Sequence, residues 1–354
     1  MNKTFTKFHF YLALYATRAK LRSGSFREVP CGIPSGLDSM APRRVFFWTP
    51  AATAGAQVIV HDVVPEILAI VGEKGLPWEV AFGPEMPPGD WDDLVCFKAV
   101  PTDEQRRRAK RLTMLICDQA DVYWGALARF DALVATSSRP FARLVSARNQ
   151  RVFFIGESEP AELITHGAKQ LSAGYSRRSD LLWHGGAYSQ NSLRDLQPVL
   201  AGMKLNPGPR LHVVSGSGPH RTETWGQLTV QFTPWSVENL KAAAETARLG
   251  IVPARTSLKS SWLKPASRVR RLFALGVPTI GDRRVPDVVT FMREFDGPAV
   301  SGIAEWKAAI ENIWGDETRL GRLASAGHGA VAKHHSTART ARQWVRFLAD
   351  AIQE

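Results

Sequence analysis

The feature that most constrains the fold is an alternation of short apolar runs with helix-like segments, which begins at Arg43 and occupies both halves of the chain. In the first half, the runs expected to be strands are residues 45–48, 80–83, 94–100, 112–117, 133–136 and 152–155. In the second half they are residues 181–184, 211–214, 228–232, 249–253, 278–280 and 299–300. Continuous apolar strands that alternate with helices are typical of parallel sheets covered on both faces. The pattern therefore predicts an α/β protein with two Rossmann-like, doubly wound domains.

The division of the chain follows from where this pattern begins and pauses. Residues 1–40 precede it and hold six Lys and Arg against two acidic residues, so we expect a disordered or peripheral basic tail. We predict an N-terminal domain over residues 41–172, a C-terminal domain over residues 173–336 and a C-terminal helix over residues 337–354. The polar stretch 157–180 is interpreted as the connection. Because doubly wound sheets bind ligands at the carboxyl ends of their strands, the domains are expected to face each other across a cleft.

Composition narrows the class of partner. The formal net charge of +12 suits an acidic partner, and nucleic acid, anionic lipid and the phosphates of a nucleotide all fit it. The basic residues are scattered and no recognised nucleic-acid-binding motif accompanies them, so nucleic acid is not expected. No run approaches the ~20 apolar residues of a membrane helix. Three cysteines without CxxC spacing argue against a disulfide framework or a structural zinc site and favour a reducing compartment.

Two short motifs each allow a functional and a structural interpretation. Asp90-Trp91-Asp92 has the DxD form of some divalent-metal sites, but it comes before a strand instead of after one. A solvated strand entrance is therefore favoured, and no metal is expected. Ser215-Gly216-Ser217-Gly218 follows a strand, and its glycines suit either a plain turn or a loop whose N–H groups approach phosphate. A nucleophile pair with His220 is disfavoured because no GxSxG elbow is present.

A basic tract precedes a predicted helix that ends at Gly276. Lys264 and Arg268 lie at the N-terminus of this helix, where unpaired N–H groups and the positive end of the helix dipole already favour an anion. Two cations at the same place favour a diphosphate site. A solvated basic face is the structural alternative.

This tract, from Lys264 to Ile280, resembles the donor-binding helix of GT-B glycosyltransferases, most closely the retaining family known as group 1. Trp183-His184-Gly185-Gly186 is similar to the strand and glycine turn that open the donor domain of that family. The segment 232–240 is similar to the loop and helix beside the nucleotide base, and the segment 249–253 to the strand before the pyrophosphate site. In the first half, residues 116–121 and 132–137 resemble acceptor-domain positions. The resemblance extends over residues 43–350.

The resemblance implies a retaining hexosyltransferase of polysaccharide biosynthesis, which moves a sugar from a nucleotide-sugar to a glycan or lipid-linked acceptor without a metal or other cofactor. It implies a cytoplasmic protein, with peripheral association with the inner membrane face left open. The candidate donor-binding residues, from the motifs and the resemblance together, are Gly185, Gly186, Gly216, Trp235, Arg255, Lys264, Arg268 and Arg271. Asp118 and Asp121 are candidates for orienting the acceptor hydroxyl.

The sequence departs from the family at one important position. The family commonly carries two Glu in an E-x7-E pattern, whose second Glu holds the donor ribose, and the corresponding positions here are Leu263 and Arg271. A guanidinium has five donors and no acceptor, so it cannot take over that role, but it can hold a phosphate or an acidic sugar. All of Lys264, Arg268 and Arg271 are expected on one helix face. Two alternatives to an active transferase therefore remain: a catalytically inactive nucleotide-sugar-binding module and a GT-B-fold sugar-nucleotide epimerase.

Overall fold

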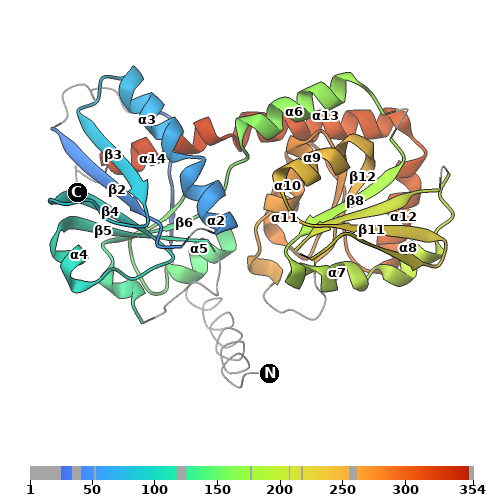
Figure 1. Ribbon diagram of the computed structural model, residues 1–354, viewed down its shortest axis with the longest axis horizontal. Helices are drawn as coiled ribbons and strands as arrows, with labels where there is room; N and C mark the ends of the chain where they lie inside the picture. The colour runs from blue at the N-terminus through green and yellow to red at the C-terminus, as the bar shows by residue number, and fades with distance from the viewer. Residues whose placement is uncertain are drawn as a thin grey trace. The chain divides into compact units, whose positions relative to one another are not determined.

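The computed structural model describes residues 25–33, 41–51, 53–117, 125–175, 178–206, 208–216, 218–254 and 261–350. The chain forms two compact units, each described here by itself (Figure 1). The first unit comprises residues 1–160 and 335–354, and the second comprises residues 161–334. Within the described part of the chain, each unit contains a seven-stranded sheet.

The sheet of the first unit has the order β1-β7-β6-β5-β4-β2-β3, and all of its neighbouring strands are parallel. Its strands are β1 (Arg27–Glu28), β2 (Arg43–Trp48), β3 (Trp78–Gly83), β4 (Trp91–Phe97), β5 (Ala109–Ile116), β6 (Ala132–Ala135) and β7 (Val152–Phe154). The central strands are buried along nearly their whole length, as continuous apolar strands covered on both faces should be.

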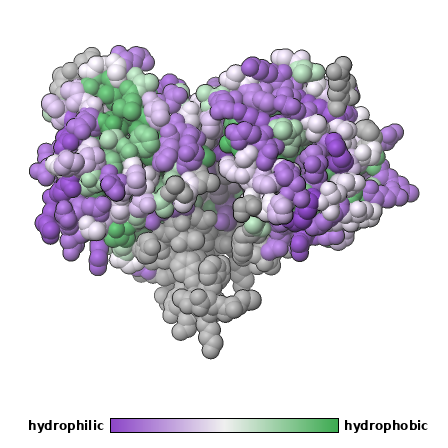
Figure 2. All heavy atoms as spheres, viewed as in Figure 1, coloured by the Kyte–Doolittle hydropathy of each residue, from purple (hydrophilic) through white to green (hydrophobic). Residues whose placement is uncertain are grey.

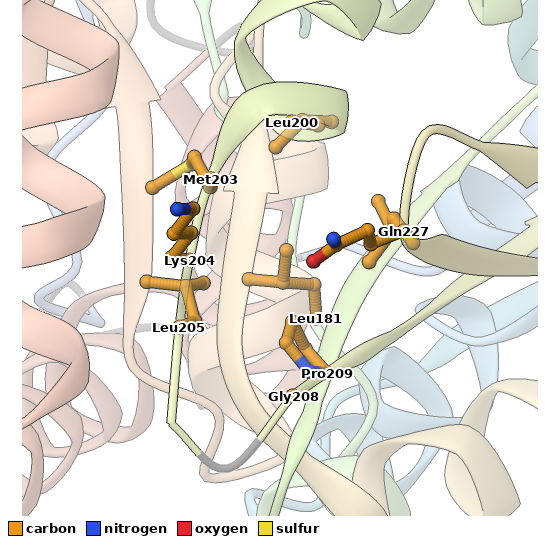
Figure 3. A pocket seen from close by; sticks show the side chains of 9 residues that line it. Leu181, Leu200, Met203, Lys204, Leu205, Gly208, Pro209 and Gln227 are labelled. Carbon is orange, nitrogen blue, oxygen red and sulfur yellow. The ribbon is translucent and has the colours of Figure 1, made fainter.

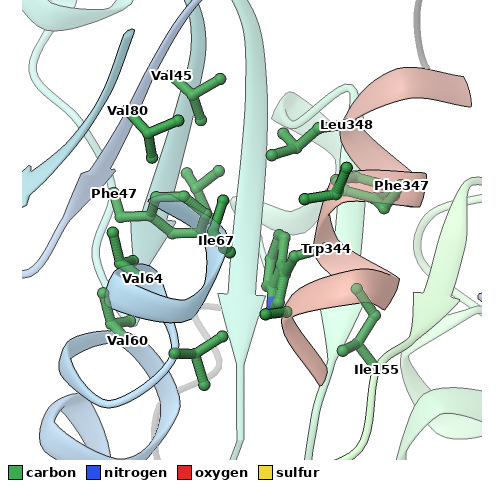
Figure 4. Close-up of a cluster of buried hydrophobic side chains, with 14 of the residues drawn as sticks. Val45, Phe47, Val60, Val64, Ile67, Val80, Ile155, Trp344, Phe347 and Leu348 are labelled. Atoms are coloured by element: carbon green, nitrogen blue, oxygen red, sulfur yellow. The ribbon is translucent and has the colours of Figure 1, made fainter. Parts of the chain in front are cut away.

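The helices of this unit include one from the far end of the sequence. They are α2 (Ala54–Ala56), η2 (Gln57–His61), α3 (Val64–Glu73), α4 (Asp103–Arg107), η4 (Leu127–Arg129), α5 (Arg139–Val145) and α14 (Thr337–Asp350). Helix α14 packs against α3, and Figure 4 shows Trp344, Phe347 and Leu348 of α14 in one apolar cluster with Phe47 of β2 and Ile67 of α3. The predicted C-terminal helix therefore completes the core of the first unit.

The sheet of the second unit has the order β10-β11-β9-β8-β12-β13-β14 and is parallel except for the pair β10–β11. Its strands are β8 (Asp180–Gly185), β9 (Arg210–Ser215), β10 (Arg221–Trp225), β11 (Leu228–Thr233), β12 (Ala247–Val252), β13 (Thr279–Asp282) and β14 (Ala299–Val300). Both β8 and β12 are buried at every position.

Helices cover both faces of this second sheet, so it is doubly wound. They are α6 (Ala161–Ser172), η5 (Ala187–Ser189), α7 (Gln190–Arg194), α8 (Gln197–Gly202), α9 (Val237–Thr246), η6 (Ser261–Leu263), α10 (Ser267–Ala274), α11 (Pro286–Arg293), α12 (Ile303–Trp314) and α13 (Glu317–His334). One apolar core joins the sheet to α7, α8 and α12, and a second joins it to α9, α10 and α11. Gly276, with φ of 70°, ends α10 as predicted, because its left-handed backbone closes the last turn.

Residues 161–172 differ from the sequence prediction. They were interpreted as part of a polar connection, whereas they form α6, which packs against α10 and α13. The second unit therefore begins at Ala161, and not after residue 172. Gly167 of α6 has a packing role: a Cβ there would lie 2.0 Å from the carbonyl oxygen of Ala274, so this glycine allows two helices to approach closely.

The predicted tail also differs in its described part. Residues 1–24 and 34–40 lie outside the described residues, but Arg27–Glu28 form β1 beside β7, and Val29 is buried. Strand β10 was not predicted at all.

Among the described residues, no helix combines the length and the apolar character needed to cross a membrane. Figure 2 shows apolar side chains on the face of the first unit over α3 and β3, where Leu68 and Phe82 are exposed.

Candidate functional site

The end of β8 and the start of α10 lie together in the second unit. Strand β8 ends with Trp183, His184 and Gly185, and α10 begins at Ser267. The N-cap residue of α10, Ala266, has no side chain that could accept from the first turn, and the N–H groups of a first turn have no intrahelical partner and favour an anion. This is the carboxyl edge of a doubly wound sheet, where ligands of such sheets bind.

Arg268 is the most unusual side chain at this edge. A Cβ built on Gly185 would lie 3.3 Å from Cδ of Arg268 and 3.0 Å from the Trp183 ring, so the arginine passes directly over the position that lacks a side chain. Its guanidinium carbon is 5.8 Å from the centroid of the Trp183 ring. Nη1 of Arg268 is buried and has no hydrogen-bond partner among the described residues. A buried cationic donor without a partner is costly, and an anion would satisfy it.

Burial also changes the titration of this group. It lowers the pKa of Arg268 to about 10, whereas the nearby carboxylate of Asp282 acts in the opposite direction. Arg268 therefore remains a cation at neutral pH. The low-dielectric surroundings that lower its pKa also strengthen its attraction for a bound anion.

His184 ties the strand to the helix. Its Nε2 lies 3.0 Å from the carbonyl oxygen of Arg268, and a carbonyl can only accept, so Nε2 carries the proton. Burial, and then the neighbouring Arg271 guanidinium, lower the pKa of His184 to about 3, with Arg268 contributing in the same direction. The ring is therefore neutral at physiological pH and adds no charge to the site.

Asp282 and Arg284 organise the neighbouring strand end. The buried carboxylate of Asp282, at the end of β13, accepts from the N–H of Ala254 at 2.8 Å and from Nη2 of Arg284 at 2.6 Å. Arg284 in turn donates to the carbonyl oxygen of Ala254 at 2.8 Å. The carboxylate that raises the pKa of Arg268, that of Asp282, thus also accepts hydrogen bonds from other donors.

The predicted loops after β9 and β11 also come together. The N–H of Trp235 donates to the carbonyl oxygen of Gly216 at 2.8 Å, and Gly216 has φ of 64°. Trp235 is held by the start of α9, where Ser236 accepts from the N–H of Asn239 at 3.0 Å. A Cβ on Gly216 would lie 3.5 Å from Cβ of Ala187, which follows β8 and Gly186. Three strand ends therefore meet at one edge.

The other predicted residues have different outcomes. Lys264 precedes α10, so it does not share a helix face with Arg268 and Arg271 as predicted, because the helix begins only at Ser267. Arg271 is in the last turn of α10, near enough to His184 to influence its pKa. Gly186 has open space where a side chain would be. Arg255, Asp118 and Asp121 lie outside the described residues.

The Asp90-Trp91-Asp92 motif lies at the amino end of β4, where a strand entrance was favoured. Asp92 accepts from the backbone N–H of Arg44 and from Nζ of Lys110, both at 2.8 Å. Among the described residues, no group of three or more His, Cys, Asp or Glu side chains is arranged to hold a metal ion.

A pocket of about 290 Å³ lies elsewhere in the second unit (Figure 3). Its lining includes Leu181 at the start of β8, Pro209 before β9 and Leu228 at the start of β11. It is therefore at the amino edge of the sheet, opposite to the edge at which Arg268 lies. The lining is mainly aliphatic, with Lys204 and Gln227 as its polar members.

Sequence reasoning missed His184, Asp282 and Arg284. The motif Gly281-Asp282-Arg283-Arg284 follows a predicted strand, and polar residues directly after a parallel strand are a detectable signal. For His184 the signal is weaker. A lone histidine in an apolar strand does not indicate its hydrogen-bond partner, which here is a helix carbonyl 84 residues later in the sequence.

Solved structures with the same architecture include known glycosyltransferases. A sucrose-phosphate synthase from Thermosynechococcus elongatus is 15% identical, with a TM-score of 0.64 over 88% of this chain and 99% of that chain. HepE of Anabaena in complex with UDP and glucose is 14% identical, with a TM-score of 0.58 over 87% of this chain and 100% of that chain. A glycosyltransferase from Rickettsia africae is 9% identical, with a TM-score of 0.59 over 89% of this chain and 100% of that chain.

At this low identity the likeness concerns the fold. A scan of protein-family models finds no match, and neither does a search of curated proteins. The two doubly wound sheets and these structural likenesses confirm the predicted fold class, which is GT-B.

Proposed function

We propose that this protein binds a nucleotide-sugar through its diphosphate and transfers the sugar to a hydroxyl group of an acceptor. The observation that carries the proposal is the guanidinium of the half-buried Arg268 at the carboxyl edge of the second sheet, whose Nη1 is inaccessible to solvent and has no partner among the described residues. The N–H groups of the first turn of α10 point to the same edge and add to its preference for an anion.

The chemistry of sugar transfer suits such a site. When the bond between the anomeric carbon and the diphosphate oxygen breaks, the electron pair remains on the diphosphate, which gains negative charge. Arg268 and the helix N–H groups would stabilise that charge where it develops, without a metal ion. The proposal extends to a retaining hexosyltransferase that acts on a glycan or lipid-linked acceptor, in the cytoplasm or at the membrane surface.

The choice of nucleotide is guided by the structural neighbours. HepE is described in complex with UDP and with UDP-glucose, and an alpha-glucosyltransferase with a TM-score of 0.56 is described in complex with UDP. Uridine donors are therefore the first to test. A thermal-shift screen with UDP-, GDP-, ADP- and CDP-sugars should identify one class that raises the melting temperature, because a ligand that binds only the folded state stabilises it.

An active transferase must then release nucleoside diphosphate from the stabilising donor, at a rate that rises with added acceptor and persists in EDTA. If no nucleotide-sugar or nucleoside diphosphate shifts the melting temperature at millimolar concentration, the proposed function is wrong.

Two other functions, an inactive binding module and an epimerase, would use the same site. Arg271 is the residue that motivates both. The group 1 pattern has a ribose-binding Glu where this chain has Arg271. A chain that binds the donor but neither hydrolyses nor transfers it would be an inactive binding module. One that changes the donor's own sugar without an acceptor would be an epimerase, which product analysis on the donor alone would reveal.

A further inference from the structure

Three consecutive residues at the end of β8 contact Arg268 or leave room for it. Trp183 presents its ring to the guanidinium, whose carbon lies 5.8 Å from the ring centroid. Gly185 leaves room for the arginine side chain, since a Cβ there would be 3.3 Å from its Cδ. His184 is between them and holds the backbone of the same arginine through its hydrogen bond to the carbonyl oxygen, at 3.0 Å.

We propose that His184 is the positioning residue of the anion site, and that its Nε2–H group fixes the first turn of α10 so that the Arg268 guanidinium stays aimed at a bound diphosphate. The proposal rests on the proposed function only for the identity of the anion. It assigns a function to a residue that acts through its hydrogen bond to the backbone of Arg268.

The geometry makes the tie effective. Arg268 is the second residue of α10, so its carbonyl belongs to the first turn, and the Ala266 N–H is held from the other side by Asp287 at 2.8 Å. The start of the helix is therefore held at two backbone positions, Arg268 from β8 and Ala266 from α11. With both ties in place, the direction in which Arg268 leaves the helix is set by the sheet and its helices.

The chemistry of the ring matters as well as its position. His184 is 3% exposed and lies beside two guanidinium groups, Arg268 and Arg271. A charged lysine or arginine in its place would add a third cation and compete with Arg268 for the anion. A neutral ring that donates one hydrogen bond ties the helix without that competition.

A purely structural interpretation of His184 is that its ring fills space under α10. Two substitutions distinguish the interpretations. In His184→Gln the amide nitrogen reaches about as far as Nε2 and still donates, although the ring is lost. In His184→Met the volume is similar and the donor is lost. If the ring only fills space, the two variants should behave alike.

The test is the affinity for inorganic diphosphate, measured by calorimetry on the full chain, with Arg268→Met as the reference for a lost anion site. His184→Met should weaken binding about tenfold, which corresponds to about 1.4 kcal/mol, whereas His184→Gln should stay within about threefold of wild type. Melting temperatures are measured alongside, so that a general loss of stability is recognised.

A second measurement does not depend on whether His184→Met folds. Nitrogen NMR of histidine-labelled wild-type protein should show His184 with a protonated Nε2 and a bare Nδ1 from pH 5 to pH 8. Adding diphosphate should shift these resonances in wild type and leave them unshifted in Arg268→Met. A bare Nε2, or no response to diphosphate, overturns the proposal.

The outcomes separate this inference from the proposed function. If wild type binds diphosphate but no nucleotide-sugar, the proposed function fails and the positioning of Arg268 stands. If wild type binds a nucleotide-sugar and His184→Met binds diphosphate as tightly as wild type, the positioning inference fails alone. If wild type binds neither ligand, both fail.

Discussion

Arginines with buried nitrogen atoms occur at the amino edge of the first sheet and at the carboxyl edge of the second, and they differ in whether a carboxylate is paired with them. At the amino edge of the first sheet, Asp93 accepts from Nε of Arg43 and from Nε of Arg111, each at 2.5 Å, and all three side chains are nearly inaccessible. Arg43 also donates to the carbonyl oxygen of Leu348 near the end of α14. At the carboxyl edge of the second sheet, Arg268 has no ion pair among the described residues, and its Nη1 is buried.

The difference indicates what each arginine is for. Arg111 also has buried Nη atoms without hydrogen-bond partners among the described residues, but the charge of Asp93 faces it directly. The cluster of Asp93, Arg43 and Arg111 joins β2, β4 and β5 to α14. It therefore holds the C-terminal helix against the sheet of the first unit. Arg268 has no ion pair among the described residues, and it lies where ligands of doubly wound sheets bind. A buried cation that already has its carboxylate stabilises the fold, and one without a carboxylate is available to an anionic ligand.

The largest effect on stability is expected from Asp93→Asn. The substitution leaves Arg43 and Arg111 buried beside each other without an opposing charge, which should cost about 3–5 kcal/mol in the free energy of unfolding. Chemical denaturation gives this quantity directly. The matched control is Asp92→Asn, one residue away, whose partner Lys110 is exposed and whose loss should cost about 1 kcal/mol or less. Equal losses for the two variants would mean that the Asp93 cluster is not structural.

Arg268→Met should give the opposite result. Removing a half-buried cation that has no ion pair among the described residues should leave the free energy of unfolding unchanged or raise it, since the desolvation cost is removed. Affinity for the nucleotide-sugar should fall by about 1.5–3 kcal/mol, or tenfold and more. If Arg268→Met is much less stable than wild type but keeps its donor affinity, then Arg268 stabilises the fold and does not bind the ligand.

The pH dependence of the free energy of unfolding tests whether His184, at the carboxyl edge of the second sheet, is held neutral in the folded protein. The folded pKa of His184 is lowered to about 3, below its ordinary value of 6.5, so only the unfolded chain binds this proton between those two pH values. Its contribution to stability is complete above pH 6.5 and is lost as the pH falls toward 3. Between pH 7 and pH 5 the wild type should lose about 2 kcal/mol relative to His184→Gln. A constant difference between the two proteins would show that the ring is not held neutral.

Much of the fold could be predicted because apolar runs and helical spacing are local signals. The strands of both sheets were identified this way, except β1 and β10. Strand β10, Arg221–Trp225, is polar and only partly buried, because it is an antiparallel edge strand and not one covered on both faces. Gly250 lies within β12, where a Cβ would be 2.7 Å from Leu272 of α10, so the strand and the helix pack closely at this position.

The site could be predicted only in its local part. Arg268 and the start of its helix follow from a basic tract before a helical pattern, and Gly216 and Trp235 from loops after strands. The tie between His184 and Arg268, and the occupation of Asp282 by Ala254 and Arg284, depend on contacts between distant segments. The lack of an ion pair for Arg268 among the described residues is such a property too, because the nearby carboxylate of Asp282, 14 residues later in the sequence, accepts from Ala254 and Arg284.

The smallest and most specific effect is expected from two adjacent glycines. In Gly185→Ala the new Cβ would lie 3.0 Å from the Trp183 ring and 3.3 Å from Cδ of Arg268, so one of the two must move by a few tenths of an ångström. The ring is fully buried, whereas the arginine side chain is flexible, so the arginine should give way and lose part of its aim. We expect donor affinity to fall by about 1 kcal/mol, or about fivefold, with little change in the free energy of unfolding. Gly186→Ala is the matched control, since nothing lies within 4 Å of its Cβ and its φ of −64° suits any residue. Calorimetry with the nucleotide-sugar on both variants decides the point: if alanine at the two positions has the same effect, Gly185 does not make room for Arg268.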